Sequence, residues 1–495
     1  MNLLTDAWIP VRENKQYQEL SLQEVLCSDK DWQISCHRDD FELATLQLLV
    51  CLTQVVLMPE NLAELRERER AYLEPTTYQK TIEPFIDWFD LLHPTQPFMQ
   101  TRGIDAKELT PIQKIFVGLP EGNNPAYFNP VGEISKIALN YAAIALFNQA
   151  ANSPSFGGGF KGSLRGGAPI TVLIKGSSLR STVWRNIISR AQLEESGLLT
   201  KTDSPNWVDV VKQGEKIYSH EIGICRGLFW QPAHIELTIQ KKSSIDDCSG
   251  KAISTYVDGF FKEKFTYELQ DTWPHPHSPR EWVTKKGETV MKFKSFTTTA
   301  PAWTQMTNYL IEKESEKEGY IPPLAVSQYA RLFPGEPLTL MIGGYRNKQA
   351  SILQRRHEML SFARGWENHL EDMQEIVQVA LEIKDVLSKK IYGFAKQIQM
   401  EKPGGLSDRA RDQFFLRSEA TMHSVMREMD FDEFEITLSS LIQKLSGLAQ
   451  DIYEQLSAPY QHSPKMLEAY VKTRAGIRKG LREIKNKYIQ EGVGV

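Results

Sequence analysis

The stretch MQEIVQVALEIKDVLSKKIYGFAKQI, residues 373–398, repeats apolar side chains at every third or fourth position. That spacing places them one above another on a single face of an α-helix. The apolar positions are Met373, Ile376, Val377, Ala380, Leu387, Ile391, Phe394 and Ile398. Because an amphipathic helix is stable mainly through burial of its apolar face, the stretch predicts a helix packed against other helices.

Three further helical segments follow, at residues 407–429, 432–456 and from Pro464 onward. Ser407-Asp408, which comes after two glycines, has the composition of a helix N-cap. The stripe of the third segment is Leu438, Leu441, Ile442, Leu445, Leu448 and Ile452, and that of the last is Leu467, Tyr470, Val471, Ile477, Leu481, Ile484 and Tyr488. Helices of similar length with short connections predict an antiparallel four-helix bundle over residues 356–495.

The last helical segment is also strongly basic. Its cations are Lys472, Arg474, Arg478, Lys479, Arg482, Lys485 and Lys487, with Glu483 as the single acid among them. A solvated polar face is one interpretation, since most charged helix surfaces are of that kind. The single sign of charge supports the alternative, a face that contacts an anionic partner.

Residues 1–355 mix short β-like runs with helices and hold most of the prolines, glycines and tryptophans. Runs rich in β-branched and aromatic residues predict strands at 170–174, 235–239 and 265–269, and helical patterns occur at 40–57 and 137–148. Strands and helices do not alternate regularly, which favours an irregular mixed domain over a doubly wound sheet. The predicted fold class is therefore α+β, with a mixed domain over residues 1–355 followed by the bundle.

Bulk composition is that of an ordinary globular protein, with 495 residues, 41% hydrophobic and 24% charged. A net charge of −4 argues against non-specific coating of nucleic acid but leaves room for a local basic face.

The five cysteines form no C-x-x-C pair, so we expect reduced thiols and no zinc site. MNLLTDAWIPV at the start lacks a signal-peptide pattern, and the apolar run 43–58 is too short for a membrane span. A cytoplasmic, soluble protein is expected.

The segment SFGGGFKGSLRGG, residues 155–167, combines six glycines with Lys161 and Arg165. Glycine lets the backbone adopt positive φ and approach a ligand closely, and the two cations favour a polyanion as that ligand. A tight structural connection is the competing interpretation. A Walker A nucleotide loop is excluded because no G-x-x-x-x-G-K-[ST] match occurs.

Two further segments suggest contact with nucleic acid. GGYRNKQA, residues 343–350, is predicted as a polar tip before a helix, from which Gln349 could wedge between base pairs. In FKEKF, Lys262 and Lys264 would share one face if the segment is a strand. Together with the glycine segment, these two segments supply exposed backbone, a cation and a wedge. A protein that recognises DNA by distorting one of its grooves needs all three.

Motifs for catalysis or metal binding are missing from the sequence. Asp39, Asp40 and Glu42 come directly before an apolar run, where acidic residues are more often N-terminal helix charges than metal ligands.

Several long motifs, in this order, closely resemble the CasA family, the large subunits of the type I-E CRISPR Cascade complex. They are MNLLTDAWIPV, HRDDFELATLQLLVCL, HPTQPFMQTRG, AIALFNQA, SFGGGFKGSLRGG, RGLFWQPAHIEL, WPHPHSPR and GGYRNKQASILQRRHE. The resemblance covers nearly the whole chain and is strongest up to about residue 365. It implies a non-enzymatic subunit that finds a short protospacer-adjacent motif (PAM) in double-stranded DNA, helps open the duplex, and recruits the Cas helicase-nuclease. The implied partners are the other Cascade subunits with their guide RNA; no membrane is involved.

The resemblance also implies roles for individual residues. The family's glycine loop falls on Gly157, Gly158 and Gly159, its lysine finger on Lys264 with Lys262 as the alternative, and its glutamine wedge on Gln349 between Lys348 and Ala350. A loop that contacts the guide-bearing end of the complex falls on Tyr127, Phe128 and Asn129. The bundle is where the family contacts the small subunits and the DNA strands.

Departures from the family pattern concern zinc above all. Some relatives carry two cysteine pairs that bind zinc, one before AIALFNQA and one before the lysine finger. The first region here reads GEISKIALNY, and the second retains only Cys248, so we expect no zinc and no other cofactor. Two other functional classes remain open: a purely architectural subunit, and a nucleotide-binding enzyme that uses the glycine segment.

Overall fold

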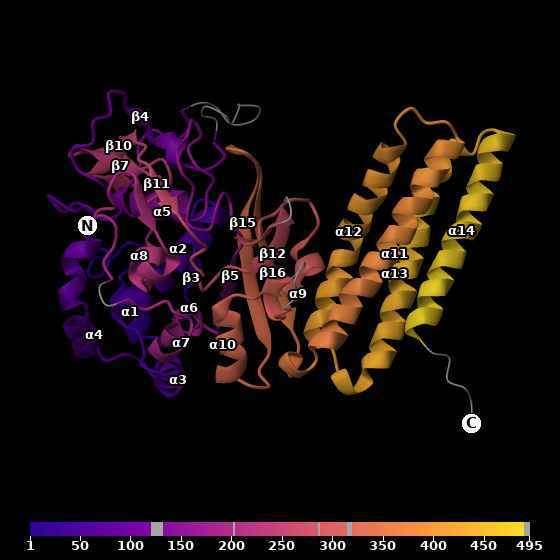
Figure 1. The fold of residues 1–495 in the computed structure, drawn as a ribbon, viewed down its shortest axis with the longest axis horizontal. Coiled ribbons are helices and arrows are strands. Elements are labelled where there is room, and N and C mark those ends of the chain that lie inside the picture. The colour runs from indigo at the N-terminus through magenta and orange to yellow at the C-terminus, as the bar shows by residue number, and fades with distance from the viewer. Residues whose placement is uncertain (120–131, 201–202, 286–287, 314–318, 490–495) are drawn as a thin grey trace. The chain divides into compact units, whose positions relative to one another are not determined.

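A computed structural model describes residues 1–119, 132–200, 203–285, 288–313 and 319–489 (Figure 1). The chain divides into two compact units. The first comprises Met1–Thr297, Glu312–Phe333 and Leu340–Met359, and the second Thr298–Ile311, Pro334–Thr339 and Leu360–Val495. The first unit mixes sheets and helices and the second is mainly helical, so the predicted α+β class is confirmed.

Four long helices form the bundle of the second unit, coloured orange to yellow in Figure 1. They are α11 (Leu370–Gln397), α12 (Pro403–Glu428), α13 (Phe434–Ser457) and α14 (Pro464–Tyr488). Each buries one apolar face, and on α11 this face includes Ile376, Leu387 and Phe394 of the predicted stripe. The Ser463 side chain accepts a hydrogen bond from the Met466 backbone N–H and caps α14, with Pro464 in the first turn.

The start of α12 corrects one prediction. The helix begins at Pro403, so Gly404 and Gly405 lie inside its first turn and Ser407 is not the cap. Proline suits the first helical position because its fixed φ is helical and its missing N–H would have no partner there. The Ser407 hydroxyl instead donates to the Ser388 carbonyl oxygen of α11, at 3.0 Å.

The stripe predicted for α14 is wrong at its first turns. Leu467 and Val471 are 47% and 56% exposed. The side of α14 that meets α11 carries small residues, and a Cβ added at Gly480 would lie 2.9 Å from the Val386 side chain. Such close approach fixes the rotation of α14 about its axis, which turns the larger aliphatic side chains near its start outward.

Small sheets of two or three strands make up the β part of the first unit, within the described residues. Their strand orders are β2-β1-β3 (Gln16–Leu20, Ile9–Glu13, Gln33–Ile34), β4-β10-β7 (Thr110–Pro111, Tyr256–Glu263, His234–Gln240), β16-β15-β5 (Ser351–Phe362, Leu338–Lys348, Thr171–Ile174), β13-β12-β14 (Glu288–Phe293, Arg280–Lys285, Tyr320–Ile321), β11-β6 (Tyr267–Leu269, Glu215–Ile217) and β8-β9 (Ser244–Ile245, Ala252–Ile253). The three strands predicted from sequence are confirmed as β5, β7 and a shorter β11.

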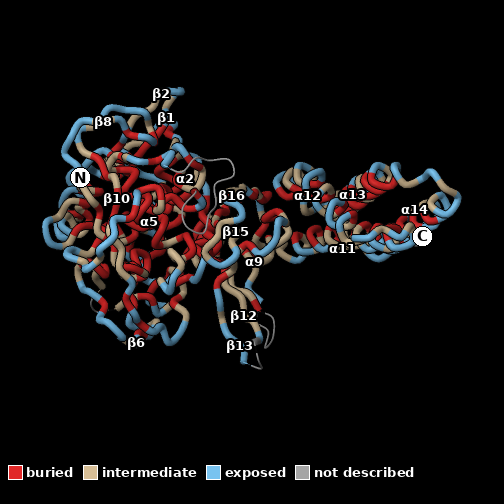
Figure 2. Tube along the Cα trace, turned by 90° about the horizontal axis from the view of Figure 1, so that it is seen from above, coloured by how far each residue is buried: buried red, intermediate tan, exposed pale blue. Residues whose placement is uncertain are grey.

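Two buried helices, α2 (Asp39–Val56) and α5 (Leu139–Ala151), pack against each other in the core of the first unit (Figure 2). Both were predicted, and Asp39, Asp40 and Glu42 lie in the first turn of α2 as expected. Several polar side chains inside this core form hydrogen bonds with backbone groups. The Gln54 amide, for instance, donates to the Ile188 carbonyl oxygen at 2.9 Å and accepts from the Ile188 N–H at 2.6 Å.

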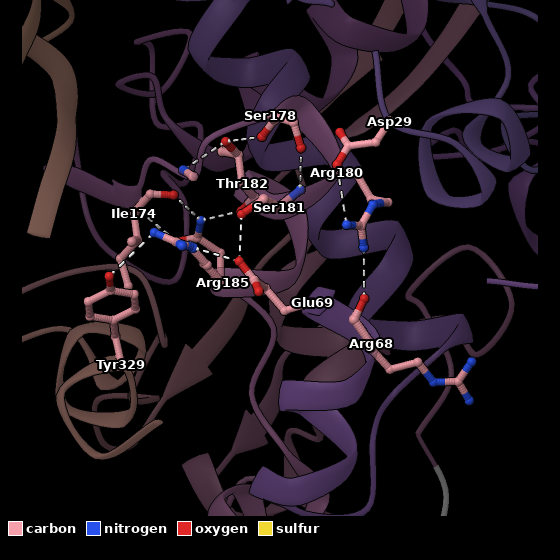
Figure 3. A network of polar contacts seen from close by, with 12 residues as sticks. Asp29, Arg68, Glu69, Ile174, Ser178, Arg180, Ser181, Thr182, Arg185 and Tyr329 are labelled. Carbon is pink, nitrogen blue, oxygen red and sulfur yellow. Dashed lines mark hydrogen bonds and ion pairs between the residues drawn. The ribbon is translucent and has the colours of Figure 1, made fainter. Parts of the chain in front are cut away.

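A network of arginines fixes the segment that follows β5 (Figure 3). On α6 (Leu179–Arg185), Arg180 donates to the Arg68 carbonyl oxygen of α3 (Leu62–Arg70) at 2.9 Å and to Asp29 at 3.3 Å. Arg185 and Ser181 both donate to the Glu69 carboxylate, at 3.0 and 2.7 Å. Because β5 pairs with β15, this network also supports the hairpin formed by β15 and β16.

Helices α1 (Leu22–Cys27), α4 (Pro75–Ile82), α7 (Arg190–Glu195), α8 (Ile224–Leu228) and α10 (Leu324–Leu332) complete the first unit, and the short α9 (Thr307–Leu310) belongs to the second. No helix in the described part of the chain combines the length and the apolar character needed to span a lipid bilayer.

Two isoleucines of α13 test the packing of the bundle. Ile442 is 2% exposed and Ile436 is 67% exposed. We expect Ile442→Ala to lower the free energy of unfolding by about 2–5 kcal/mol, because it removes buried methyl groups and leaves a cavity. Ile436→Ala is the matched control and should change it by about 0.5 kcal/mol or less. Chemical denaturation followed by far-UV circular dichroism measures both, and equal effects would contradict the assigned burial.

Candidate nucleic-acid interface

The glycine loop, residues 155–167, connects α5 to the segment that leads into β5. Gly157, Gly158 and Gly159 have φ values of 80°, 56° and 88°, all in the left-handed region. A Cβ at Gly158 would meet no atom within 4 Å, so backbone conformation rather than internal crowding requires glycine there. Gly158 and Gly159 are exposed. The loop therefore offers bare backbone on the surface of the first unit.

Aromatic rings anchor this loop to β10. Phe156 lies edge-on to Phe160, with ring centroids 5.6 Å apart, and 5.8 Å from Phe260 of β10. The N–H of Phe160 donates to the Gly157 carbonyl oxygen at 3.1 Å, which closes a turn around the exposed glycines. The position of the loop is thus set by packing on both sides of the glycines.

Arg165 has a structural role that the sequence interpretation missed. Its guanidinium is buried and donates to Thr171 at 2.9 Å, Ser278 at 2.6 Å and the Asn152 side chain at 2.8 Å. Burial lowers the pKa of Arg165 to about 9. The expectation that Arg165 attracts a polyanion is wrong, because its donors are directed into the protein. Lys161 remains exposed, with its ammonium 5.6 Å from the Tyr267 ring centroid.

Two lysines reach the glycine loop, Lys262 from β10 and Lys264 from the residue that follows this strand. Lys264 is exposed, and its Nζ lies 3.8 Å from the point that a Cβ on Gly159 would occupy. Lys262 donates to the Thr110 hydroxyl and lies 6.0 Å from the Phe156 ring centroid. Strand β10 ends at Glu263, so the predicted alternation within one strand does not extend to Lys264. The exposed ammonium beside the loop is that of Lys264.

The segment GGYRNKQA corrects another prediction, because a strand follows it instead of a helix. Strands β15 and β16 are joined by Gln349 and Ala350 alone, which makes the segment the tip of a β-hairpin. Gln349 has φ 54°, and its carbonyl oxygen accepts from the Asn347 side chain at 2.6 Å. Lys348 and Gln349 are exposed and Ala350 is half-buried. The tip thus presents Gln349 on a short, locally bonded turn.

The hairpin tip and the glycine loop lie beside each other in the first unit. The Asn347 amide nitrogen is 4.0 Å from the position of a Cβ on Gly167. Ser155, Phe156 and Ala350 also line one small cavity of about 30 Å³. The structure therefore brings Gly157–Gly159, Lys264 and the Lys348–Ala350 tip into one region. Tyr127, Phe128 and Asn129 lie outside the described residues.

A buried charge network holds the hairpin below its tip. The Tyr345 hydroxyl donates to Asp40 at 2.8 Å and accepts from the Asn148 amide at 2.8 Å. Arg38 donates to both carboxylate oxygens of Asp40, at 2.9 and 2.7 Å. Burial opposes ionisation of Asp40, but the hydrogen bond and charge of Arg38 outweigh it, and the pKa of Asp40 is lowered. The network joins β15 to the first turn of α2 and to α5.

Gly343 and Gly344 lie in close packing, which sequence reasoning did not detect. A Cβ at Gly343 would lie 2.2 Å from Leu43 Cδ2 of α2. At Gly344, with φ 152°, it would lie 2.7 Å from the Pro169 carbonyl oxygen, just after the glycine loop. These two glycines let the hairpin lie directly on the core helix and beside the loop.

The sequence model of the family described as CRISPR-associated protein Cse1 matches residues 2–452. The chain belongs to the Cse1 family. A relative of this Cse1-family chain, CRISPR-associated protein CasA/Cse1 of Thermus thermophilus, is 26% identical over 199 residues. That match spans 38% of this chain and 39% of the relative.

Solved structures of Cse1 proteins share the fold. The crystal structure of Thermobifida fusca Cse1 matches with a TM-score of 0.77 at 20% identity, covering 97% of this chain and 98% of that chain. A chain of a CRISPR RNA-guided surveillance complex matches with a TM-score of 0.65 at 14% identity, covering 97% and 99%. At these identities the likeness establishes the fold of the Cse1-family chain.

The Asp40 network predicts a pH-dependent stability. Because the pKa of Asp40 is lower in the folded protein than its ordinary value of about 3.9, its stabilisation is complete above that value and is lost as pH falls through the folded pKa. We expect Asp40→Asn to cost about 3–5 kcal/mol at pH 7, as for one partner of a buried ion pair, and less at pH 2. Denaturation from pH 7 to pH 2 measures this difference.

Asp408→Asn is the matched control, since Asp408 pairs with Arg411 at the surface, 3.0 Å away. Its cost should stay at about 0–1 kcal/mol throughout. A pH-independent cost for Asp40→Asn would contradict the proposed electrostatic origin.

Proposed function

We propose that this chain is the non-catalytic large subunit of an RNA-guided CRISPR surveillance complex of the type I-E Cascade kind. In this role it recognises the PAM of double-stranded DNA through the minor groove and helps to start strand separation and R-loop formation. Membership of the Cse1 family and the fold shared with a chain of a surveillance complex support the assignment. The observation that carries it is the convergence of exposed glycine backbone, the Lys264 ammonium and the Gln349 tip.

Each part of this site suits one task on duplex DNA. The left-handed glycines carry no side chains that would hold the backbone away from a groove floor. The Lys264 ammonium beside Gly159 can bond a base edge or a phosphate at the same depth. Protein then reads a short motif and duplex shape, while guide RNA pairing reads the rest of the target.

The hairpin supplies mechanical support for a wedge. Gln349 stands on a two-residue turn whose strand is fixed by the buried Tyr345 hydroxyl. A side chain that separates base pairs must resist the cost of unstacking, which is a few kcal/mol per base step. Lys348 beside it adds a phosphate contact and a steeper salt dependence.

The basic helix α14 supports a second contact with nucleic acid. Three of its cations bind acids inside the bundle unit: Arg474 pairs with Glu454 at 2.7 Å, Lys487 with Glu382 at 2.7 Å, and Lys479 with Glu483 at 3.9 Å. Lys472, Arg478, Arg482 and Lys485 are exposed, and none has an acidic partner within 4 Å in the described part of the bundle. We assign this face to the DNA strands or the small subunits of the complex.

The remaining partners are part of the same proposal. The other Cascade subunits with their guide RNA would contact Tyr127, Phe128 and Asn129, and the Cas helicase-nuclease would dock on the assembled complex. Nucleotide hydrolysis by the purified chain would favour the enzyme alternative. PAM selection by a complex that lacks this chain would favour the architectural one.

We expect Gln349→Ala to slow R-loop formation on relaxed, PAM-containing DNA by about tenfold or more, because the wedge no longer offsets unstacking. Initial docking should change much less. Gln354→Ala, an exposed glutamine on the same hairpin, is the matched control. Stopped-flow fluorescence of the reconstituted complex measures opening, and a gel-shift assay measures docking. An unchanged opening rate for Gln349→Ala would exclude the wedge.

Lys264→Ala should weaken binding of PAM-containing duplex by about 1–3 kcal/mol if the ammonium bonds a base edge. Lys242→Ala, another exposed lysine of the first unit, should have little effect. Binding is measured at a fixed salt concentration on matched DNA with and without the PAM. Equal losses on both DNAs would show a phosphate contact without a role in recognition.

A further inference from the structure

Two segments far apart in the sequence are joined by a single carboxylate. Asp247 Oδ2 accepts hydrogen bonds from the Ser135 N–H at 2.7 Å, the Ser135 hydroxyl at 2.9 Å and the Lys136 N–H at 2.9 Å. The Asp247 N–H donates in return to the Lys136 carbonyl oxygen at 2.9 Å. Four hydrogen bonds therefore hold the loop at residues 246–250 against residues 134–138.

The neighbouring carboxylate adds to the same connection from inside the protein. Asp246 is fully buried, and its Oδ1 accepts from the Ala138 N–H at 2.9 Å. Ala138 is the N-cap residue of α5 and has no side chain that could cap the helix, so Asp246 takes over one of the free N–H groups. The second oxygen of Asp246 accepts from the Ser249 N–H at 2.8 Å, which fixes the loop itself.

Both joined segments lead directly to the proposed DNA site. The backbones of Ile137 and Val257 exchange hydrogen bonds of 3.0 and 2.9 Å, which ties the start of α5 to β10. Helix α5 continues into the glycine loop, and β10 ends one residue before Lys264. The spacing between Gly159 and Lys264 therefore depends on how these two elements are held together.

The side chains here do not fit the zinc site that the family resemblance suggests for these two segments. Cys248 is the one cysteine present in them. A structural zinc site needs four ligands, almost always cysteine and histidine side chains. The bonded oxygens of Asp246 and Asp247 face N–H and O–H donors. Within the described ranges, no group of three or more histidine, cysteine or acidic residues could hold a metal ion.

We propose that Asp246 and Asp247 form an aspartate clamp, which joins the two segments without a metal and positions Lys264 beside Gly159. Hydrogen bonds to an ionised acceptor are about twice as strong as neutral ones, which suits them to such a connection. Asp246 and Asp247 are positioning residues, because they act on DNA only through α5 and β10. This second part of the proposal rests on the proposed function.

The metal-free nature of the clamp is tested without DNA. The purified full-length chain, from cells grown with added zinc, should contain no stoichiometric zinc by elemental analysis. EDTA should leave its melting temperature unchanged, while Asp247→Ala should lower it. One zinc per chain together with a melting temperature lowered by EDTA would overturn the clamp.

The positioning role is tested in the reconstituted complex with PAM-containing and PAM-less DNA. Asp247→Ala should reduce the preference for PAM-containing DNA as Lys264→Ala does, and the double variant should lose no more than either single variant. Asp271→Ala is the matched control, because Asp271 accepts from the Ser219 N–H and hydroxyl in the same way, at 2.5 and 2.6 Å. It should lower stability but keep the PAM preference.

Additive losses from Asp247→Ala and Lys264→Ala would overturn the positioning role, as would equal losses for Asp271→Ala. If Lys264→Ala itself leaves the PAM preference unchanged, the proposed function fails and the positioning role fails with it. The zinc content and the effect of EDTA still decide whether the clamp is metal-free.

Discussion

A buried ion pair must be fully hydrogen-bonded, and this requirement organises the first unit around Arg38 and Asp40. Each oxygen of Asp40 has a donor, and the second of them receives both Arg38 and the Tyr345 hydroxyl. Because the donors come from the start of α2 and from β15, and Asn148 of α5 joins through Tyr345, three elements must meet at one point. A displaced hairpin would leave a carboxylate buried without its partners, which is a large cost. The exposed hairpin tip is therefore held in place by buried hydrogen bonds of Arg38, Asp40 and Tyr345.

Glycine serves two different physical purposes in this region. Gly157, Gly158 and Gly159 are required by their positive φ angles, and the backbone of Gly158 and Gly159 is exposed to solvent. At Gly344 the backbone lies against the Pro169 carbonyl oxygen with no room for a methyl group, and at Gly343 a methyl group would displace the end of the Leu43 side chain. The first set creates a surface that a ligand can approach, and the second brings that surface and the hairpin together. In the sequence both sets look alike, as glycine-rich segments, and the structure shows that the physical reason for glycine differs between them.

Local patterns predicted the elements whose stability is local. The stripes of α11 and α13, the buried helices α2 and α5 and the strand β5 follow from periodicity and composition. The hairpin was missed because β15 gains its partner from residues 171–174, far away in the sequence, while GGYRNK alone resembles a loop. The burial of Arg165 was missed because its acceptors at Asn152, Thr171 and Ser278 are not visible as a motif. Leu467 and Val471 were misplaced because small residues on the neighbouring face of α14 set the helix rotation.

The hydrogen bonds of Asp246 and Asp247 determine what this connection requires in order to form during folding. Their donors and acceptors are all encoded in the chain, so the connection is complete as soon as folding brings residues 134–138 and 246–250 together. In the proposed aspartate clamp no metal has to be acquired during biosynthesis, and competition for scarce zinc would not reach this part of the molecule. Thiolate ligands can be oxidised, whereas carboxylates are not subject to that damage. If the clamp is metal-free as proposed, newly made chains assemble this connection under metal starvation in the same way as when zinc is plentiful.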